Sequence, residues 1–364
     1  MRICFLLPGY RQKPVGGFKV VYEYANRLVE RGHYVTVIHP AASIQHAPVI
    51  YRIKKGVRFI QRKMDQGYKP GAWFNVRDRV HLLWVPSPRE KYIPNADIIV
   101  ATAWETAEWV AAYPDEKGLK YYLIQHQETW AGEEARVMAT WKLPLHKIVI
   151  ARWLADIAGE LGESAEYVPN GLDFNAVGVD RPPEERDPAT VVMLYHLSEW
   201  KGSKDGLQAL KRVKKLIPDL QANLFGVPEC PADLPDWVHY HRNPTPKKLR
   251  ELYNGSAILI APSRVEGWGL VPSEGLSCGC ALAATDVGGH REFSFHDQTA
   301  LVSPPCDPVA LAKNIERLIG DRALRLRLAR GGHEFIQQFT WEKAVAGIED
   351  VFFKHSITTS SSRG

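Results

Sequence analysis

The sequence contains no long hydrophobic run and few cysteines. None of its stretches approaches eighteen consecutive apolar residues, so we expect no helix that spans a bilayer. The apolar run Ile3–Leu7 is too short for a signal peptide, and Pro8 and Gly9 end it. The five cysteines are odd in number and lack the spacing of a zinc site. These absences argue against a disulfide framework and predict reduced thiols in a cytoplasmic protein.

Size and composition are those of a globular protein with two domains. A chain of 364 residues exceeds one average domain, and two domains of about 150–180 residues each fit this length. Apolar residues make up 45% and charged residues 24%, an ordinary balance for a chain that folds in water.

Positive charge is concentrated in the first half of the chain. Residues 1–150 hold 22 Lys and Arg against 13 Asp and Glu. Residues 51–92, here called the basic segment, hold eleven of these basic residues among seven aromatic ones. Such a mixture suits an anionic membrane face or a nucleic acid. The alternative is a solvated basic face over ordinary core aromatics. The segment contains no recognisable nucleic-acid module, so we expect an anionic membrane surface and no nucleic acid as partner.

The pattern of residues 258–292 predicts a phosphate site. Ile258–Ala261 reads as a buried parallel strand, and Ala281–Thr285 as a second one. A loop with Gly267 and Gly269 lies between them, followed by a helix that we expect to run from about Pro272 to Cys278. A strand, a glycine loop and a helix N-terminus together present backbone N–H groups at the carboxyl edge of a sheet, where a phosphate binds readily.

Two carboxylates accompany this loop, Glu266 and Glu274, with seven residues between them. A carboxylate repels phosphate but accepts hydrogen bonds from hydroxyls, and a nucleotide sugar carries hydroxyls on both sides of its diphosphate. The alternative is a solvated Glu266 and a Glu274 that favours the helix dipole.

Together with V-E-G-W-G-L and the later V-G-G-x-x-E, this spacing resembles the E-x7-E signature of the retaining GT-B glycosyltransferases of family 4. The resemblance implies an α/β fold of two doubly wound Rossmann-like domains that face a cleft. It also implies that Glu274 binds the nucleotide ribose and that Glu266 lies near the hydroxyls of the donor sugar. The loop amides that would contact the diphosphate or the sugar belong to Gly267, Trp268, Gly269 and Leu270.

Further candidate residues follow from the same resemblance. Lys201, in H-L-S-E-W-K-G, stands where the family has a lysine that reaches the diphosphate, whereas His196 replaces the family's arginine. The charge at His196 therefore depends on pH. Gly16 and Gly17, in P-V-G-G-F-K, resemble the family's first loop. His126 follows a predicted strand, at the edge where open α/β sheets bind ligands. The alternatives are a surface lysine and a structural loop histidine.

Alternating strands and helices in both halves predict the domain organisation. Residues 1–170 form an N-terminal domain on the acceptor side, and residues 190–340 form a C-terminal domain that holds the donor. Residues 171–189 are the expected linker. We expect a last helix at residues 341–354 to pack back on the first domain and residues 355–364 to be a disordered tail.

The predicted function is transfer of a hexose from a nucleoside-diphosphate sugar to a glycan or lipid-linked acceptor, with retention, in cell-surface polysaccharide or glycolipid synthesis. Glu266, Lys201 and His126 are the expected catalytic residues. No cofactor is expected besides the nucleotide-sugar substrate, and no catalytic metal, because the sequence contains no Asp-x-Asp motif. The alternatives are an inactive glycan-binding protein, a nucleotide-sugar epimerase and an inverting transferase on the same fold. The predicted location is the cytoplasm, with peripheral binding to the inner face of the membrane.

Overall fold

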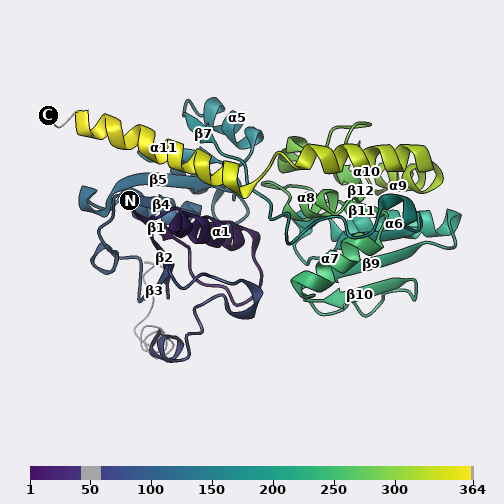
Figure 1. Cartoon of the computed structure of the whole chain (residues 1–364), viewed down its shortest axis with the longest axis horizontal. Helices are drawn as coiled ribbons and strands as arrows, with labels where there is room; N and C mark the ends of the chain where they lie inside the picture. Colours follow the sequence, from purple (N-terminus) through teal and green to yellow (C-terminus); the bar gives the residue numbers. More distant parts are fainter. Residues whose placement is uncertain (42–58, 362–364) are drawn as a thin grey trace. The chain divides into compact units, whose positions relative to one another are not determined.

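The computed structural model describes residues 1–41 and 59–361 and divides the chain into two compact units (Figure 1). Unit 1 comprises Met1–Pro169 and Glu342–Gly364, and unit 2 comprises Asn170–Trp341. Residues 51–58 of the basic segment lie outside the described residues.

Unit 1 is built on a seven-stranded, wholly parallel sheet with the strand order β3-β2-β1-β4-β5-β6-β7. Its central strands are short apolar runs whose side chains are buried on both faces, as a parallel sheet covered by helices requires. The strands are β1 (Arg2–Leu6), β2 (Tyr34–Pro40), β3 (His81–Val85), β4 (Ile98–Ala101), β5 (Leu119–Ile124), β6 (His146–Val149) and β7 (Ala165–Tyr167).

The helices of unit 1 include one from the far end of the chain. They are α1 (Gly16–Glu30), α3 (Trp104–Ala111), α4 (Glu134–Thr140), α5 (Arg152–Glu160) and α11 (Trp341–Ser361), in addition to a short helical stretch at residues 59–64. In α11, Phe352 packs edge-to-face on Tyr121 at 4.9 Å between ring centroids, and the carboxylate of Glu349 bonds Arg31 and His33. The helix continues to Ser361, whereas the expected helix ended at residue 354.

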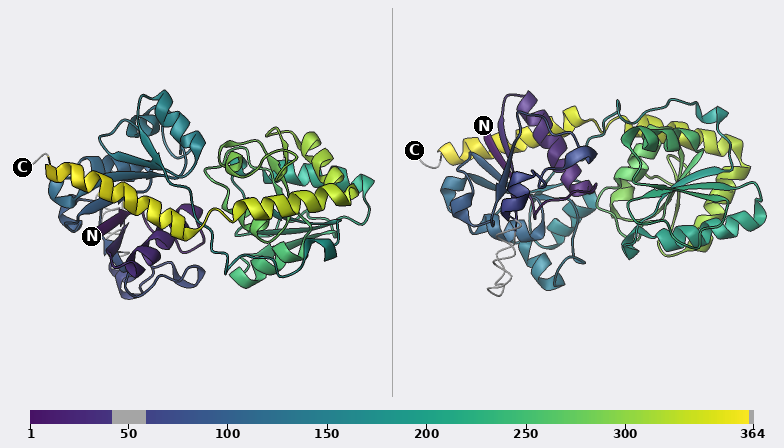
Figure 2. Two further views of the ribbon diagram at one scale, coloured as in Figure 1. Left: turned by 45° about the horizontal axis from the view of Figure 1, so that its top comes forward. Right: turned by 90° about the horizontal axis from the view of Figure 1, so that it is seen from below.

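Unit 2 repeats the architecture with a six-stranded parallel sheet of order β10-β9-β8-β11-β12-β13. Helices cover both faces of this sheet (Figure 2). The strands are β8 (Thr190–Leu194), β9 (Gln221–Gly226), β10 (Val238–Arg242), β11 (Ile258–Ala261), β12 (Ala281–Thr285) and β13 (Leu301–Ser303). The helices are α6 (Ser203–Leu216), α7 (Pro246–Gly255), α8 (Leu270–Ser277), α9 (Pro308–Gly320) and α10 (Arg322–Ile336).

The residues predicted as a linker are part of unit 2. Arg186 is 3% exposed and donates hydrogen bonds to the carbonyls of Tyr253 and Ser256, near the end of α7, and to that of Cys278, just after α8. A polar stretch that reads as a linker in the sequence is thus held by one buried guanidinium at two helix C-termini, where a positive charge is favoured.

Several elements carried no clear signal in the sequence. The strand β10 lies at a sheet edge with the polar sequence V-H-Y-H-R, and β7 and β13 have only three residues each. Such strands lack the continuous apolar run that identifies a buried strand. Among the described residues, no helix combines the length and hydropathy that a membrane crossing needs.

Candidate functional site

The glycine loop of unit 2 connects β11 to α8. Helix α8 begins at Leu270, two residues before the predicted start, and Pro272 is its third residue, where a backbone N–H is not needed. Its N-cap residue Gly269 has a φ of +99°, and no side chain caps the helix. The first-turn amides therefore point to a ligand position at the carboxyl edge of the sheet.

A second glycine pair, Gly288 and Gly289, packs against this loop. The N–H of Gly289 donates to the carbonyl of Glu266 at 2.8 Å. A side chain at Gly289 would place its Cβ 2.5 Å from the backbone of Gly267, so only glycine permits this contact. The V-G-G-x-x-E motif thus fixes the path of the loop. Trp268 is 3% exposed, and its ring packs on that of Phe339 at 5.0 Å between centroids, so its indole is part of the core of unit 2.

Lys201 and Glu266 lie in direct contact. The Lys201 Nζ donates to both carboxylate oxygens of Glu266 at 2.7 Å, and the two side chains are 26% and 13% exposed. The residues predicted to bind the diphosphate and the donor sugar are therefore paired with each other. An ammonium group that faces the end of a glycine loop can neutralise charge that develops on a diphosphate.

His196 follows β8 and is partly buried beside this pair. Its Nδ1 accepts a hydrogen bond from the N–H of Ser198 at 3.0 Å, so this nitrogen carries no proton. Burial lowers the pKa of His196, the charge of Lys201 lowers it further, and the charge of Glu266 opposes both. The imidazole is therefore neutral at pH 7 in this structure.

Glu274 lies in α8 and is 7% exposed. The hydroxyl of Tyr253, on α7, donates to its Oε2 at 3.2 Å. Burial raises the pKa of Tyr253 well above its ordinary value, and the negative charge of Glu274 adds to the shift. The phenol is consequently a permanent donor that orients the carboxylate. The sequence offered no signal for this role of Tyr253.

His290 is another residue that the sequence reading missed. It is 1% exposed, and its Nδ1 lies 2.9 Å from the carbonyl of Thr285, to which it donates. A side chain at Gly269 would bring its Cβ within 3.0 Å of the His290 ring. His290 therefore packs directly against the glycine loop. Burial lowers the pKa of this histidine.

The remaining predicted residues belong to unit 1. Gly16 and Gly17 form the first turn of α1. The side-chain amide of Gln125, just after β5, donates to the carbonyl of Gly17 at 3.2 Å. This bond joins the predicted glycine pair to the segment that carries His126.

His126 lies in the segment after β5 among aromatic rings. Its Nδ1 accepts from the N–H of Gln127 at 2.8 Å, and its ring packs edge-to-face on Trp130 and Trp153 at 4.0 and 5.7 Å. Glu128, two residues on, has a left-handed backbone with φ +61° and accepts a hydrogen bond from the N–H of Trp104 at 2.8 Å. Burial raises the pKa of Glu128 to about 7.

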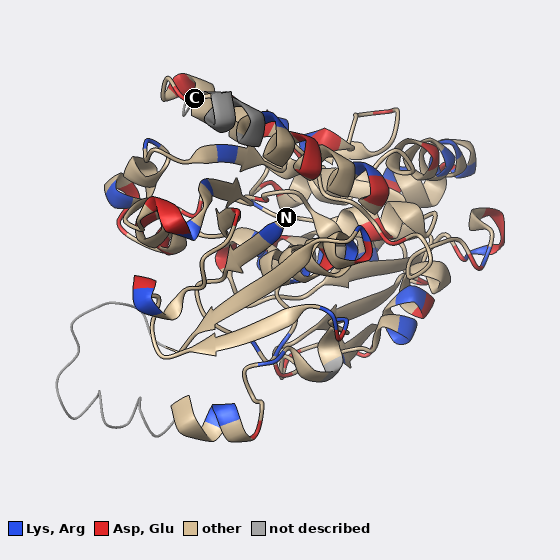
Figure 3. Ribbon diagram, turned by 60° about the vertical axis from the view of Figure 1, so that its left-hand side comes forward, with Lys and Arg blue, Asp and Glu red and all other residues tan. Residues whose placement is uncertain are grey.

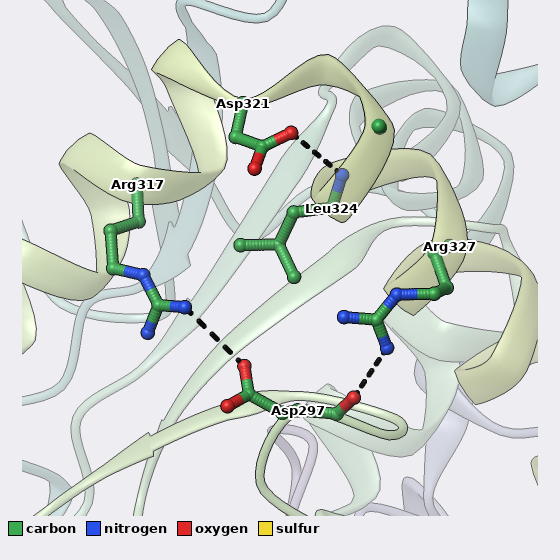
Figure 4. Close-up of a pocket in the computed structure, with 6 residues that line it drawn as sticks. Asp297, Arg317, Asp321, Leu324 and Arg327 are labelled. Carbon is green, nitrogen blue, oxygen red and sulfur yellow. Dashed lines mark hydrogen bonds and ion pairs between the residues drawn. The ribbon is translucent and has the colours of Figure 1, made fainter.

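A surface pocket lies between α9 and α10 and contains none of the predicted site residues (Figure 4). Its polar groups serve the local structure. Arg317 pairs with the carboxylate of Asp297 at 3.5 Å, and Arg327 donates to the carbonyl of the same residue. Asp321 accepts from the N–H of Leu324 at 2.9 Å and so caps α10. Among the described residues, no three His, Cys, Asp or Glu side chains gather into a group that could hold a metal ion.

Two parallel α/β sheets of this kind are the fold of the GT-B glycosyltransferases to which the chain is structurally similar. The chain matches sucrose-phosphate synthase from Thermosynechococcus elongatus with a TM-score of 0.72 and 16% identity, over 98% of this chain and 99% of that one. It matches HepE from Anabaena, solved in complex with UDP-glucose, with a TM-score of 0.72 and 16% identity, over 97% and 100%. At this identity the likeness concerns the fold, which is the GT-B type predicted from the sequence.

Residues 179–335, which lie within unit 2, match the family model described as "Glycosyl transferases group 1". Over 96 residues the chain is 38% identical to an uncharacterized glycosyltransferase of Methanocaldococcus jannaschii. This alignment covers 26% of this chain and 27% of that protein. Over 117 residues it is 32% identical to a D-inositol 3-phosphate glycosyltransferase of Xylanimonas cellulosilytica. This alignment covers 32% of this chain and 28% of that protein. These matches span about a quarter of each relative's length.

Proposed function

We propose that the protein is a glycosyltransferase that moves a hexose from a nucleoside-diphosphate sugar to a glycan or lipid-linked acceptor, with retention at the anomeric carbon, in polysaccharide or glycolipid synthesis. The observation that carries this proposal is the contact between Lys201 and Glu266, which lies in the glycine loop that leads into the first turn of α8. Lys201 and the backbone amides of the loop can bind a diphosphate, and the carboxylate of Glu266 can accept hydrogen bonds from sugar hydroxyls.

In this proposal unit 2 binds the donor. Lys201 and the amides of Gly267–Leu270 take the diphosphate, and Glu274, oriented by Tyr253, accepts hydrogen bonds from the ribose. Glu266 accepts from hydroxyls of the hexose. The catalytic contribution is chiefly electrostatic, because the leaving diphosphate can take the acceptor proton and the site needs only to stabilise its charge. Unit 1, with His126, serves the acceptor.

The proposal includes a peripheral contact with an anionic membrane. Residues 59–64 are helical and carry Ile60 and Met64, one turn apart, which are 59% and 82% exposed. Figure 3 shows this short helix next to the grey segment, with its basic residues in blue. On its other face, Phe59 stacks on Trp84 at 5.8 Å, so the helix is anchored to the sheet. Apolar side chains flanked by Arg and Lys suit a surface of acidic lipid.

The test is an activity assay with UDP-glucose as the first donor, chosen because HepE was solved with it. We expect release of UDP and a product whose anomeric configuration, read by NMR, equals that of the donor. Lys201→Met should abolish the release, whereas Lys204→Met, an exposed lysine of α6, should not. An inverted product identifies an inverting transferase, and an altered sugar without acceptor identifies an epimerase. Absence of turnover with every nucleotide sugar, despite glycan binding, contradicts the proposal.

A further inference from the structure

Two loops at the carboxyl edge of unit 2 are fastened to each other. The carbonyl of Trp200 accepts hydrogen bonds from the N–H groups of Arg264 at 2.7 Å and Val265 at 3.3 Å. Gly202, with φ +63°, packs so closely that a Cβ there would lie 1.8 Å from the carbonyl oxygen of Pro262. The loop before α6 (residues 196–202) and the loop after β11 (residues 262–269) therefore behave as one piece of structure.

Two ion pairs bridge these loops in parallel. Lys201 bonds Glu266, and Arg264 bonds Asp205 through two hydrogen bonds, Nε to Oδ2 at 2.8 Å and Nη2 to Oδ1 at 3.0 Å. Asp205 lies in the first turn of α6 and its side chain is 11% exposed. The four charges sum to zero, with one cation and one anion on each side.

A bound nucleotide sugar would affect the two ion pairs differently. If Lys201 binds the diphosphate, it must give up part of its contact with Glu266, and this ion pair then holds the two loops together less firmly. The pair of Arg264 and Asp205 contains no residue assigned to the donor. Its planar, two-point geometry holds orientation better than an ammonium contact.

We propose that Arg264 and Asp205 are positioning residues of the donor site, whose two-point pair keeps the loops together while Lys201 exchanges the carboxylate of Glu266 for the diphosphate. This inference rests on the proposed function in that it names the diphosphate as the ligand of Lys201. The pairing of Lys201 with Glu266 itself depends only on the geometry.

A matched control exists in the same unit. Arg250 of α7 bonds Asp180 in the same two-point manner, at 2.7 and 2.6 Å, and neither residue has a role in the proposed site. Arg264→Met and Arg250→Met therefore each remove one comparable pair. The thermal midpoint of each variant is measured as well, because Arg264→Met leaves a carboxylate that is 11% exposed and Arg250→Met one that is 53% exposed, so that effects on the site can be separated from effects on stability.

The first experiment needs no nucleotide. Acetylation of the empty protein by an N-hydroxysuccinimide ester is followed by mass spectrometry, with the exposed Lys204 as internal reference. Arg264→Met should raise the rate at Lys201 relative to Lys204 about fivefold, and Arg264→Lys by less. Arg250→Met should leave the ratio unchanged. An unchanged ratio in Arg264→Met, or an equal rise in both variants, overturns the positioning role.

The second experiment measures UDP affinity by calorimetry. Arg264→Met should weaken binding about tenfold and Arg250→Met less than twofold. In a Lys201→Met background, Arg264→Met should cause no further loss, because the residue it positions is gone; independent effects would add instead. Additive losses overturn the inference. Failure of the parent protein to bind any nucleoside diphosphate contradicts the proposed function, whereas the acetylation result still decides whether the pair positions Lys201.

Discussion

Glu274 offers the most direct test of nucleotide binding by a single residue. If its carboxylate accepts ribose hydroxyls, Glu274→Ala should lose about 1.5–3 kcal/mol of nucleoside diphosphate affinity, the range for hydrogen bonds to a charged group. Tyr253→Phe keeps the carboxylate and removes only its orienting hydroxyl, so it should lose less. Glu266→Ala should reduce turnover more than diphosphate affinity, because the free nucleotide lacks the sugar. Calorimetry and initial rates decide, and equal losses of diphosphate affinity in Glu274→Ala and Glu266→Ala contradict these roles.

We expect His196 to make donor affinity depend on pH. In the empty site, burial and Lys201 lower its pKa, and protonation of Nδ1 would break the bond from Ser198. A bound diphosphate adds an opposite charge and so raises the pKa from that low value. Binding attributable to residue 196 is therefore strongest at low pH and declines as pH rises through the bound-state pKa.

Comparison with His196→Arg isolates the part of the pH dependence that residue 196 causes, since phosphate ionisation affects the affinities of both proteins equally. The variant carries a fixed charge, and its UDP affinity at pH 8 should match or exceed that of the parent. Titrations between pH 6 and 8.5 are the measurement. Parallel affinity curves for the two proteins would show that His196 does not touch the diphosphate.

Glu128 should make unit 1 less stable at alkaline pH. Burial raises its pKa to about 7, and Glu105 adds to the shift, so the folded state holds its proton to higher pH than the unfolded chain does. Its contribution to stability is thus present at low pH and is lost as pH rises to about 7. Glu128→Gln should stabilise the protein by about 1–3 kcal/mol at pH 8 and by much less at pH 5. Urea unfolding at the two pH values tests this, and an equal effect at both contradicts the assigned cause.

At the scale of elements, the short helix at residues 59–64 carries the membrane proposal. Replacing Ile60 and Met64 together by Ser should abolish sedimentation with vesicles rich in acidic lipid. The parent should sediment and be released by salt, because exposed charges are screened within about 10 Å at 0.1 M. Leu216→Ser is the matched control, since Leu216 is 68% exposed on α6 of unit 2. Binding that ignores lipid charge would leave only the solvated-face interpretation of the basic segment.

The elements that the sequence predicted best are those with continuous apolar runs. β11 and β12 match their predicted bounds, and α8 differs by only two residues at its start. Edge strands such as β10 escaped detection because their pairing partner, and not their own hydropathy, makes them strands. The helix α11 extends beyond the predicted residue 354, because the polar sequence of its last turns carries no apolar periodicity that would predict a helix.

For the whole molecule, the division into two compact units predicts that nucleotide slows hydrogen exchange unevenly along the chain. A ligand at a hundredfold its dissociation constant adds about 2.7 kcal/mol to the stability of whatever it binds. With UDP present, hydrogen exchange should slow in residues 196–202 and 262–274 of unit 2. The helices α9 and α10, which line the pocket of Figure 4, should change little. Protection centred on that pocket would place the nucleotide elsewhere than proposed.

Sequence alone determined the local pieces of the candidate site. The strand, glycine loop and helix of residues 258–277, the spacing of Glu266 and Glu274, and the lysine at 201 are all local in the chain. Tertiary structure alone decided their partners. Lys201 meets Glu266 across 65 residues, because β8 and β11 are neighbours in one parallel sheet and their following loops emerge at the same edge. Likewise, Tyr253 reaches Glu274, and Asp205 reaches Arg264, only through packing. No local pattern encodes such pairs, because they depend on strand order and burial.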